Sequence, residues 1–90
     1  MKKQEEVFHI YVIVYGQKKY ISAHIVRSVD NRFIPQLSEN IEEAKEYSSQ
    51  AHAERLIRER IFDNFNRKFL IESRMVPIRR KRLKIFGDEI

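Results

Sequence analysis

Two stretches near the start of the chain have the pattern of apolar and polar positions that is typical of paired strands. Residues 7–15 and 20–26 are rich in β-branched and aromatic side chains, and Gly16-Gln17-Lys18-Lys19 lies between them. This arrangement predicts a β-hairpin. A two-residue type II′ turn at Gly16-Gln17 would place Tyr15 opposite Lys18. Moving the turn by one residue at each end would leave every side chain on the same face.

The two faces of this hairpin differ in chemistry. One face is uniformly apolar and is predicted to form the core; its members are Ile10, Val12, Val14, Ile21, Ala23 and Ile25. The other face is predicted to be half-exposed or covered by a partner. A row of tyrosines suits a homodimer or partner surface, and it equally suits stacking with single-stranded bases. The candidate interface residues on this face are His9, Tyr11, Tyr15, Tyr20 and His24.

The middle of the chain predicts one weak strand and then helix. Residues 32–36 form a short extended piece that Pro35 limits to an edge. Asn40 with Glu43 has capping-box spacing and predicts one or two helical turns through Glu46. Ser48-Ser49 offers a second N-cap. The main amphipathic helix is predicted over residues 50–66, with its apolar face made of Ala53, Leu56, Ile57, Ile61 and Phe65.

A last strand is predicted over residues 68–78, where Pro77 ends the pairing. The resulting fold class is α+β: a small antiparallel sheet, built from the N-terminal hairpin and one or two further strands, with one main helix packed on one face. Residues 1–78 are predicted to be a single domain. Residues 79–90 are predicted to be a basic C-terminal strand or tail.

Composition excludes several kinds of chemistry. The 90 residues include no cysteine, so disulfides, thiolate zinc sites, iron–sulfur clusters and cysteine nucleophiles are excluded. Neither of the two glycines lies in a phosphate-binding loop motif. His9 and His24 would be cross-strand neighbours in the predicted register, but two imidazoles without a nearby carboxylate make an incomplete zinc site. We therefore expect no metal, no cofactor and no enzymatic activity.

Positive charge is concentrated near the end of the chain. Lys and Arg number 18 against 13 Asp and Glu, giving a net charge of +5, and residues 1–50 hold seven of each sign. The excess therefore lies in residues 51–90. Within this part, residues 74–84 contain four arginines and two lysines and no acidic residue. Arginine is favoured where phosphate or carboxylate is bound through two hydrogen bonds. The candidate residues for binding nucleic acid or an acidic partner are Arg74, Arg79, Arg80, Lys81, Arg82 and Lys84.

The segment from Ile41 to Ala53 resembles a pattern found in small uncharacterised proteins of phages and prophages of Gram-positive bacteria. In those proteins an Ala, an aromatic residue three positions later, a Ser or Thr, and an Ala-containing helix follow a hairpin. The matching residues here are Ala44, Tyr47, Ser48 or Ser49, and Ala53, within a resemblance over residues 7–78. The resemblance implies an accessory protein of a mobile element.

Two functions of different classes follow from these observations. The first is a non-catalytic accessory protein that binds nucleic acid through the basic stretch. The alternative is a protein-interaction module that inhibits a host enzyme or defence nuclease by contacting an acidic patch. The longest apolar run near the N-terminus, residues 10–15, is too short to cross a membrane. We therefore expect a cytoplasmic protein with no membrane partner. The face of tyrosines and histidines is compatible with a homodimer.

Overall fold

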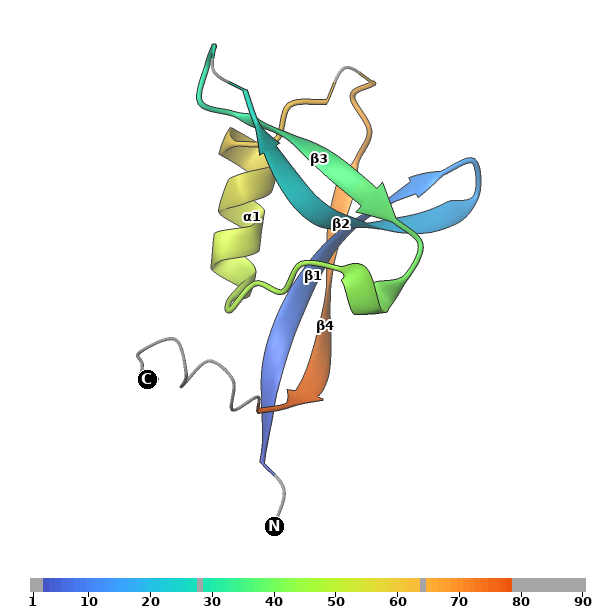
Figure 1. Cartoon of the computed structure of the whole chain (residues 1–90), viewed down its shortest axis with the longest axis vertical. Coiled ribbons are helices and arrows are strands. Elements are labelled where there is room, and N and C mark those ends of the chain that lie inside the picture. Colours follow the sequence, from blue (N-terminus) through green and yellow to red (C-terminus); the bar gives the residue numbers. More distant parts are fainter. Residues whose placement is uncertain (1–2, 28, 64, 79–90) are drawn as a thin grey trace, which may run out of the picture.

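A four-stranded antiparallel sheet carries the fold in the computed structural model, which describes residues 3–27, 29–63 and 65–78 (Figure 1). The strands are β1 (Gln4–Val14), β2 (Gln17–Val26), β3 (Phe33–Ser38) and β4 (Phe69–Pro77), in the spatial order β3-β2-β1-β4. One short 3-10 helix, η1 (Ile41–Glu43), and one α-helix, α1 (Gln50–Glu59), lie between β3 and β4. The predicted α+β architecture is confirmed.

The turn of the β1–β2 hairpin lies one residue earlier than the sequence predicts. Val14 pairs with Gln17, so the two-residue loop is Tyr15-Gly16 rather than Gly16-Gln17. Both loop residues have positive φ, 51° at Tyr15 and 80° at Gly16, which is the pattern of a type I′ turn. Like the predicted type II′ turn, it has a twist that matches that of the strands. The register shifts, but the parity of the faces up to Ile21 is as predicted.

Beyond Ile21 a β-bulge reverses the faces of β2. Ile21 pairs with Leu37 and Ala23 with Gln36, so Ser22 is the extra residue. A bulge of this kind bends its strand and changes which side chains share a face. His24 therefore lies on the same face as Ile21, whereas Ala23 and Ile25 lie on the opposite face. The prediction that Ile25 belongs to the core is wrong, since this side chain is 46% exposed.

A segment between η1 and α1 enters the gap where β1 and β2 separate. Pairing between these two strands runs only from Tyr11–Tyr20 to the turn. Further from the turn, Tyr47 exchanges both backbone hydrogen bonds with Phe8, at 2.8 and 2.9 Å, and the Lys45 N–H donates to Ile21 O at 2.8 Å. The chain thus crosses from one face of the sheet to the other at this point.

Helix α1 covers the face of the sheet that carries Ile10, Val12 and Ile21, which we call the helix face. Ser49 is the N-cap, and its side chain accepts a hydrogen bond from the His52 N–H, as the second capping signal predicts. Ala53 is fully buried and allows the helix to approach the sheet closely. The core cluster consists of Ile10, Ile21, Tyr47 and Ala53, with Leu37, Leu56, Ile57, Ile61, Phe69 and Ile71 packed against it. The predicted docking face of the helix is confirmed.

Helix α1 ends at Glu59, seven residues before the predicted end at Asn66. The next backbone groups pair with β3 instead: Phe33 N–H donates to Arg60 O at 2.8 Å, and Phe62 N–H donates to Phe33 O at 2.9 Å. Asn66 has a φ of 53°, outside the helical region. Phe65, predicted on the apolar helix face, is 75% exposed. Tertiary pairing with β3 therefore ends the helix.

The remaining predicted elements are close to the observed ones. The weak third strand is β3, an edge strand, and the last strand is β4. The helical turns predicted to run through Glu46 are shorter, because η1 ends at Glu43. Asn40 is the N-cap of η1, and its side chain accepts a hydrogen bond from the Glu42 N–H. In the described part of the chain, no helix has the length and hydropathy needed to cross a bilayer.

Candidate nucleic-acid interface

The predicted face of tyrosines and histidines does not form one exposed surface. On the outer face of the sheet, opposite α1, His9 is fully buried and Tyr20 is 7% exposed. His9 Nδ1 lies 2.8 Å from Lys45 O, so the segment after η1 covers this ring. Because a carbonyl oxygen can only accept, Nδ1 donates, and Nε2 has no partner among the described residues. Intramolecular packing, rather than a partner, covers this part of the face.

A charged cluster surrounds Tyr20 on the outer face. The Tyr20 hydroxyl donates to Glu72 Oε2 at 2.9 Å, and Lys18 Nζ donates to Glu72 Oε1 at 2.7 Å. Lys18 also lies 4.4 Å from the centre of the Tyr11 ring, a cation–π contact. Burial acts to raise the pKa of the Glu72 carboxyl, but the hydrogen bonds from Lys18 and Tyr20 outweigh it and lower this pKa. The Glu72 carboxylate is paired with Lys18 and Tyr20 within the sheet, so this cluster links β2 to β4 across the outer face.

His24 lies on the helix face, away from His9. Its ring stacks on Phe33 with 3.8 Å between centroids, and His24 Nε2 lies 2.8 Å from the Tyr47 hydroxyl. Burial, with the charges of Lys45 and Arg60 nearby, lowers the pKa of His24 to about 4. Burial also raises the pKa of Tyr47 well above its usual value. His24 is therefore a neutral packing residue at neutral pH, and the predicted cross-strand pairing with His9 is wrong.

Of the predicted interface residues, Tyr15 is the most accessible. Its side chain is fully exposed at the tip of the hairpin, and Tyr11 is half-buried beside Lys18. Tyr11 lies beside Tyr20 with 6.2 Å between the ring centroids, but Tyr20 is buried and its hydroxyl is bound to Glu72, so it adds little exposed surface to the pair.

Arg74 is the one residue of the predicted basic stretch that the structure describes. It projects from β4 on the outer face, where its guanidinium lies 3.7 Å from Glu42 and 4.0 Å from Glu46. Its side chain is 27% exposed. Arg74 therefore ties β4 to the segment around η1. The other five candidates, Arg79, Arg80, Lys81, Arg82 and Lys84, lie outside the described residues.

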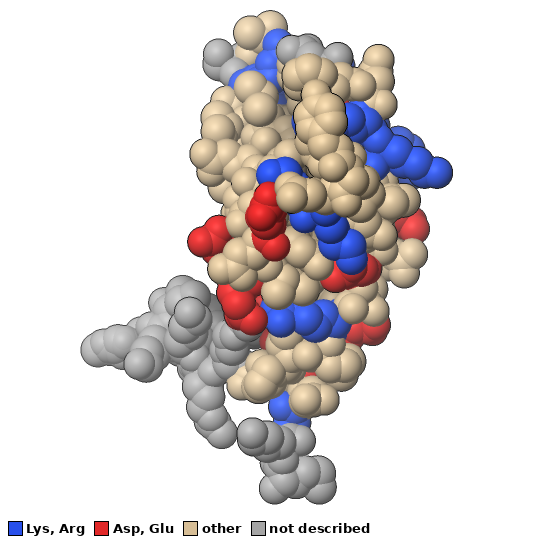
Figure 2. Space-filling model, turned by 90° about the vertical axis from the view of Figure 1, so that its right-hand side faces the viewer, with Lys and Arg blue, Asp and Glu red and all other residues tan. Residues whose placement is uncertain are grey.

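A second basic region lies at one end of the molecule, formed by residues 27 and 29–32 and by residues 60–63 and 65–68. We call it the arginine end. It contains five basic side chains and two acidic ones, Asp30 and Asp63. In the view of Figure 2, Lys and Arg are the charged side chains visible in the upper part, whereas the acidic side chains lie around and below the middle. The basic residues of the arginine end are Arg27, Arg32, Arg60, Arg67 and Lys68.

Backbone pairing at Phe33 brings the two segments of the arginine end together. Phe33 forms an isolated parallel bridge with Ile61, and Arg60 Nε donates to Asn31 O at 2.9 Å. The acceptor in this last bond is a neutral carbonyl, so the bond orients the Arg60 side chain without neutralising its charge. Two segments from opposite halves of the chain thus bring their arginines to the same end of the molecule (Figure 1).

Aromatic rings lie among these arginines. The Arg27 guanidinium lies 3.7 Å from the centre of the Phe62 ring and is paired with Asp30 at 2.8 Å. The Arg67 guanidinium lies 5.0 Å from the centre of the exposed Phe65 ring. Guanidinium groups stacked on rings in this way are oriented, and an oriented guanidinium loses less side-chain entropy when it binds an anion.

Asp63 organises the loop that follows α1. Its carboxylate accepts hydrogen bonds from Arg67 Nη2 at 2.8 Å, from Arg67 N–H at 2.8 Å and from Phe65 N–H at 3.4 Å. Burial alone would raise the pKa of Asp63, but these hydrogen bonds bring its pKa below the usual value. Asp63 is therefore charged at neutral pH and determines where the Arg67 guanidinium lies.

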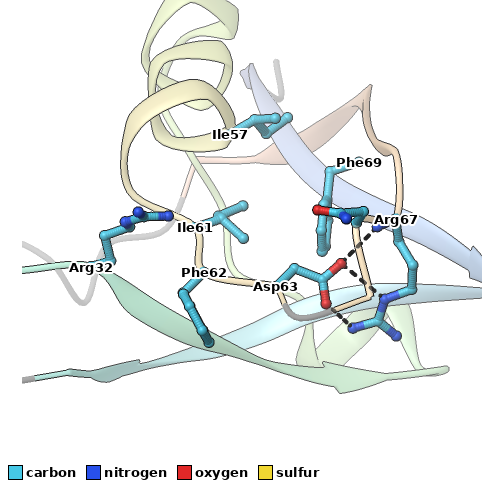
Figure 3. Close-up of a pocket in the computed structure, with 8 residues that line it drawn as sticks. Arg32, Ile57, Ile61, Phe62, Asp63, Arg67 and Phe69 are labelled. Atoms are coloured by element: carbon cyan, nitrogen blue, oxygen red, sulfur yellow. Dashed lines mark hydrogen bonds and ion pairs between the residues drawn. The ribbon is translucent and has the colours of Figure 1, made fainter. Parts of the chain in front are cut away.

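A pocket of about 350 Å³ opens in the arginine end (Figure 3). Ile57, Ile61 and Phe69 line it with apolar surface, and Arg32 and Arg67 lie on opposite sides of it. Phe62 also lines the pocket. Asp63 and Asn66 complete the lining, so the pocket is open to solvent and its accessible surface is more polar than apolar.

Searches against protein-family models, curated proteins and solved structures find no match to this chain. Within residues 3–27, 29–63 and 65–78, no three His, Asp or Glu side chains gather in a way that could bind a metal ion. Sequence reasoning missed the arginine end because its residues lie in two short segments, neither of which is basic enough to stand out. The available signal was the pairing of arginines with turn residues, Arg27 and Arg32 around Asp30-Asn31 and Arg67 after Asp63.

Proposed function

We propose that this chain is a non-catalytic nucleic-acid-binding protein, an accessory protein of a phage or another mobile element. The observation that carries the proposal is the arginine end, where two segments that meet at Phe33 bring five basic residues and the rings of Phe62 and Phe65 to the same end of the molecule. Phosphate contacts supply most of the affinity of non-specific nucleic-acid binding, and arginine suits them because its planar group donates two parallel hydrogen bonds.

The acidic partners within the arginine end support this function. Asp30 pairs with Arg27 and Arg32, and Asp63 pairs with Arg67, so both acids act on arginines rather than standing alone. These surface ion pairs are worth little in stability. Their effect is to orient guanidinium groups for a further anion, while Arg60 and Lys68 add charge. The basic residues 79–84 would add to the same electrostatic attraction.

A protein partner is the second candidate function. Ile25 and Ile34 face each other across β2 and β3 on the outer face of the sheet, and they are 46% and 43% exposed. An apolar patch beside arginines has the composition of a protein interface. In this case the arginine end would contact an acidic patch on a host enzyme or defence nuclease and inhibit it.

Binding to labelled single-stranded DNA, single-stranded RNA and duplex DNA, measured by fluorescence anisotropy over a range of salt concentrations, tests the proposal. A triple variant, Arg32→Gln with Arg60→Gln and Lys68→Gln, removes three charges from the arginine end. For single strands we expect its slope of log affinity against log salt to become shallower by about 2, since each phosphate contact contributes about 0.7.

The matched control removes the same number of charges elsewhere: Lys3→Gln with Lys45→Gln and Arg55→Gln. We expect this variant to retain most of the salt slope. If the salt slope falls equally in the two triple variants, net charge alone attracts the nucleic acid, and the arginine end is not the binding site. If the folded protein binds no nucleic acid at low salt, the proposal is wrong. Capture of a host protein that Ile34→Asp abolishes would then favour the alternative.

A further inference from the structure

The pocket in the arginine end has a shape and lining that phosphate binding alone does not need. Its walls include Ile57, Ile61 and Phe69, which all pack against the core, so the apolar surface is part of a well-packed region. A volume of about 350 Å³ lies at the small end of the range for ligand pockets, roughly 300–1,000 Å³. This is the size of a single nucleoside unit rather than of a large cofactor.

The two arginines beside the pocket have different roles. Arg67 donates to both oxygens of Asp63, through Nε at 3.2 Å and Nη2 at 2.8 Å, so its position is determined by that pair. Arg32 is held more loosely: its side chain is 46% exposed, and its nearest carboxylate, Asp30, lies 3.5 Å away. Asp63 takes two donors of Arg67, whereas Arg32 shares Asp30 with Arg27 at a longer distance, so more of the Arg32 guanidinium can reach an incoming phosphate.

Phe62 connects the apolar walls to the basic surface. Arg27 covers this ring from one side at 3.7 Å, and Phe62 is one of the residues that line the pocket. Aromatic and apolar walls next to a cation match the chemistry of a base joined to a phosphate. A base within a duplex cannot enter such a pocket, because its faces are stacked and its edges are paired.

We propose that this pocket binds one unpaired base of a single-stranded nucleic acid, with Arg32 contacting the adjacent phosphate. The inference rests on the proposed function and adds the class of substrate to it: single strands rather than duplexes. Stacking and apolar burial of one base contribute about 1–3 kcal/mol, which corresponds to about 5-fold to 150-fold in affinity.

The test compares three fluorescent probes of equal phosphate number on the wild-type protein: a thymidine oligonucleotide, an abasic oligonucleotide and a duplex. We expect the thymidine strand to bind at least about 5-fold more tightly than the abasic strand. Phe62→Leu should bring the affinity for the thymidine strand close to that for the abasic strand. The matched control is Tyr15→Leu, which changes a fully exposed ring at the hairpin tip that neither lines the pocket nor belongs to the arginine end.

The outcomes separate this inference from the proposed function. If the abasic strand binds as tightly as the thymidine strand, the pocket takes no base, although phosphate binding at the arginine end stands. The same conclusion follows if Tyr15→Leu weakens binding and Phe62→Leu does not. If none of the three probes binds at low salt, the proposed function itself fails. Thermal unfolding of both variants confirms that they are folded. The comparison of the thymidine and abasic strands uses only the wild-type protein, so it tests the inference even if a variant does not fold.

Discussion

Arg27 and Phe62 form a stacked pair, with 3.7 Å between the guanidinium carbon and the ring centre, although they come from opposite halves of the chain. The contact exists because helix α1 ends early and the following residues pair with the first residue of β3. A helix continued through Asn66 would carry Phe62 and Arg67 away from the β2–β3 turn. The short helix is therefore the feature of the fold that creates the arginine end.

Two alanines on α1 provide a matched test of helix docking. Ala53 is fully buried against the sheet, whereas Ala51 is exposed. Because Ala53 has no space for a larger side chain, Ala53→Leu should destabilise the protein by about 1–3 kcal/mol, as overpacking does. Ala51→Leu should change the free energy of unfolding by less than about 0.5 kcal/mol. Urea denaturation measures both, and equal effects would mean that a different face of the helix packs on the sheet.

The strained turn of the hairpin predicts a substitution that stabilises the protein. Tyr15 adopts a φ of 51° while its side chain is fully exposed, so the ring contributes no burial that would offset the backbone strain. Asn tolerates this conformation, and Tyr15→Asn should therefore stabilise the protein by about 0.5–1 kcal/mol.

Gly16 supplies the control for this turn. A Cβ at this position would meet no atom within 4 Å, so Gly16→Ala reports the backbone conformation alone. With a φ of 80°, the substitution should cost about 1 kcal/mol. A stabilising effect of Gly16→Ala, or a loss of stability in Tyr15→Asn, would contradict the type I′ turn.

Burial of His24 predicts that stability depends on pH. Because burial lowers its pKa from 6.5 to about 4, the unfolded chain binds a proton at a higher pH than the folded protein does. Stability is therefore fully present above about pH 6.5 and falls as the pH decreases toward 4, by at most about 1.4 kcal/mol per pH unit. Urea denaturation at pH 7, 6 and 5 measures this slope. His24→Gln should reduce it, and an unchanged slope would mean that His24 is not buried as described.

The sequence pattern is sufficient to predict the elements that depend on local periodicity. Alternation in residues 7–15 and 20–26 predicts the hairpin and, as far as Ile21, its faces. The spacing of Ala53, Leu56 and Ile57 predicts the helix and its docking side. Ser49 predicts the helix start correctly, because an N-cap is a local signal.

Non-local pairing accounts for what the sequence did not predict. The bulge at Ser22 moves His24 to the helix face, and no periodicity within β2 signals one extra residue. The helix ends at Glu59 because β3 offers its backbone groups to Arg60 and Phe62, a competition that helix propensity does not describe. The candidate site depends on this early end of the helix, which is why the sequence directed attention to the basic stretch and not to the arginine end.

The central claim is that nucleic acid binds at the arginine end, and mapping of amide chemical shifts on the ¹⁵N-labelled protein tests it most directly. Titration with a short thymidine oligonucleotide at low salt should shift the amides of Arg32, Phe62 and Arg67 and their neighbours most strongly. Amides near Arg74 should shift little, since its guanidinium is already paired with Glu42 and Glu46. Largest shifts at the hairpin tip around Tyr15, or no shifts at Arg32 and Phe62 under saturating oligonucleotide, would contradict the account.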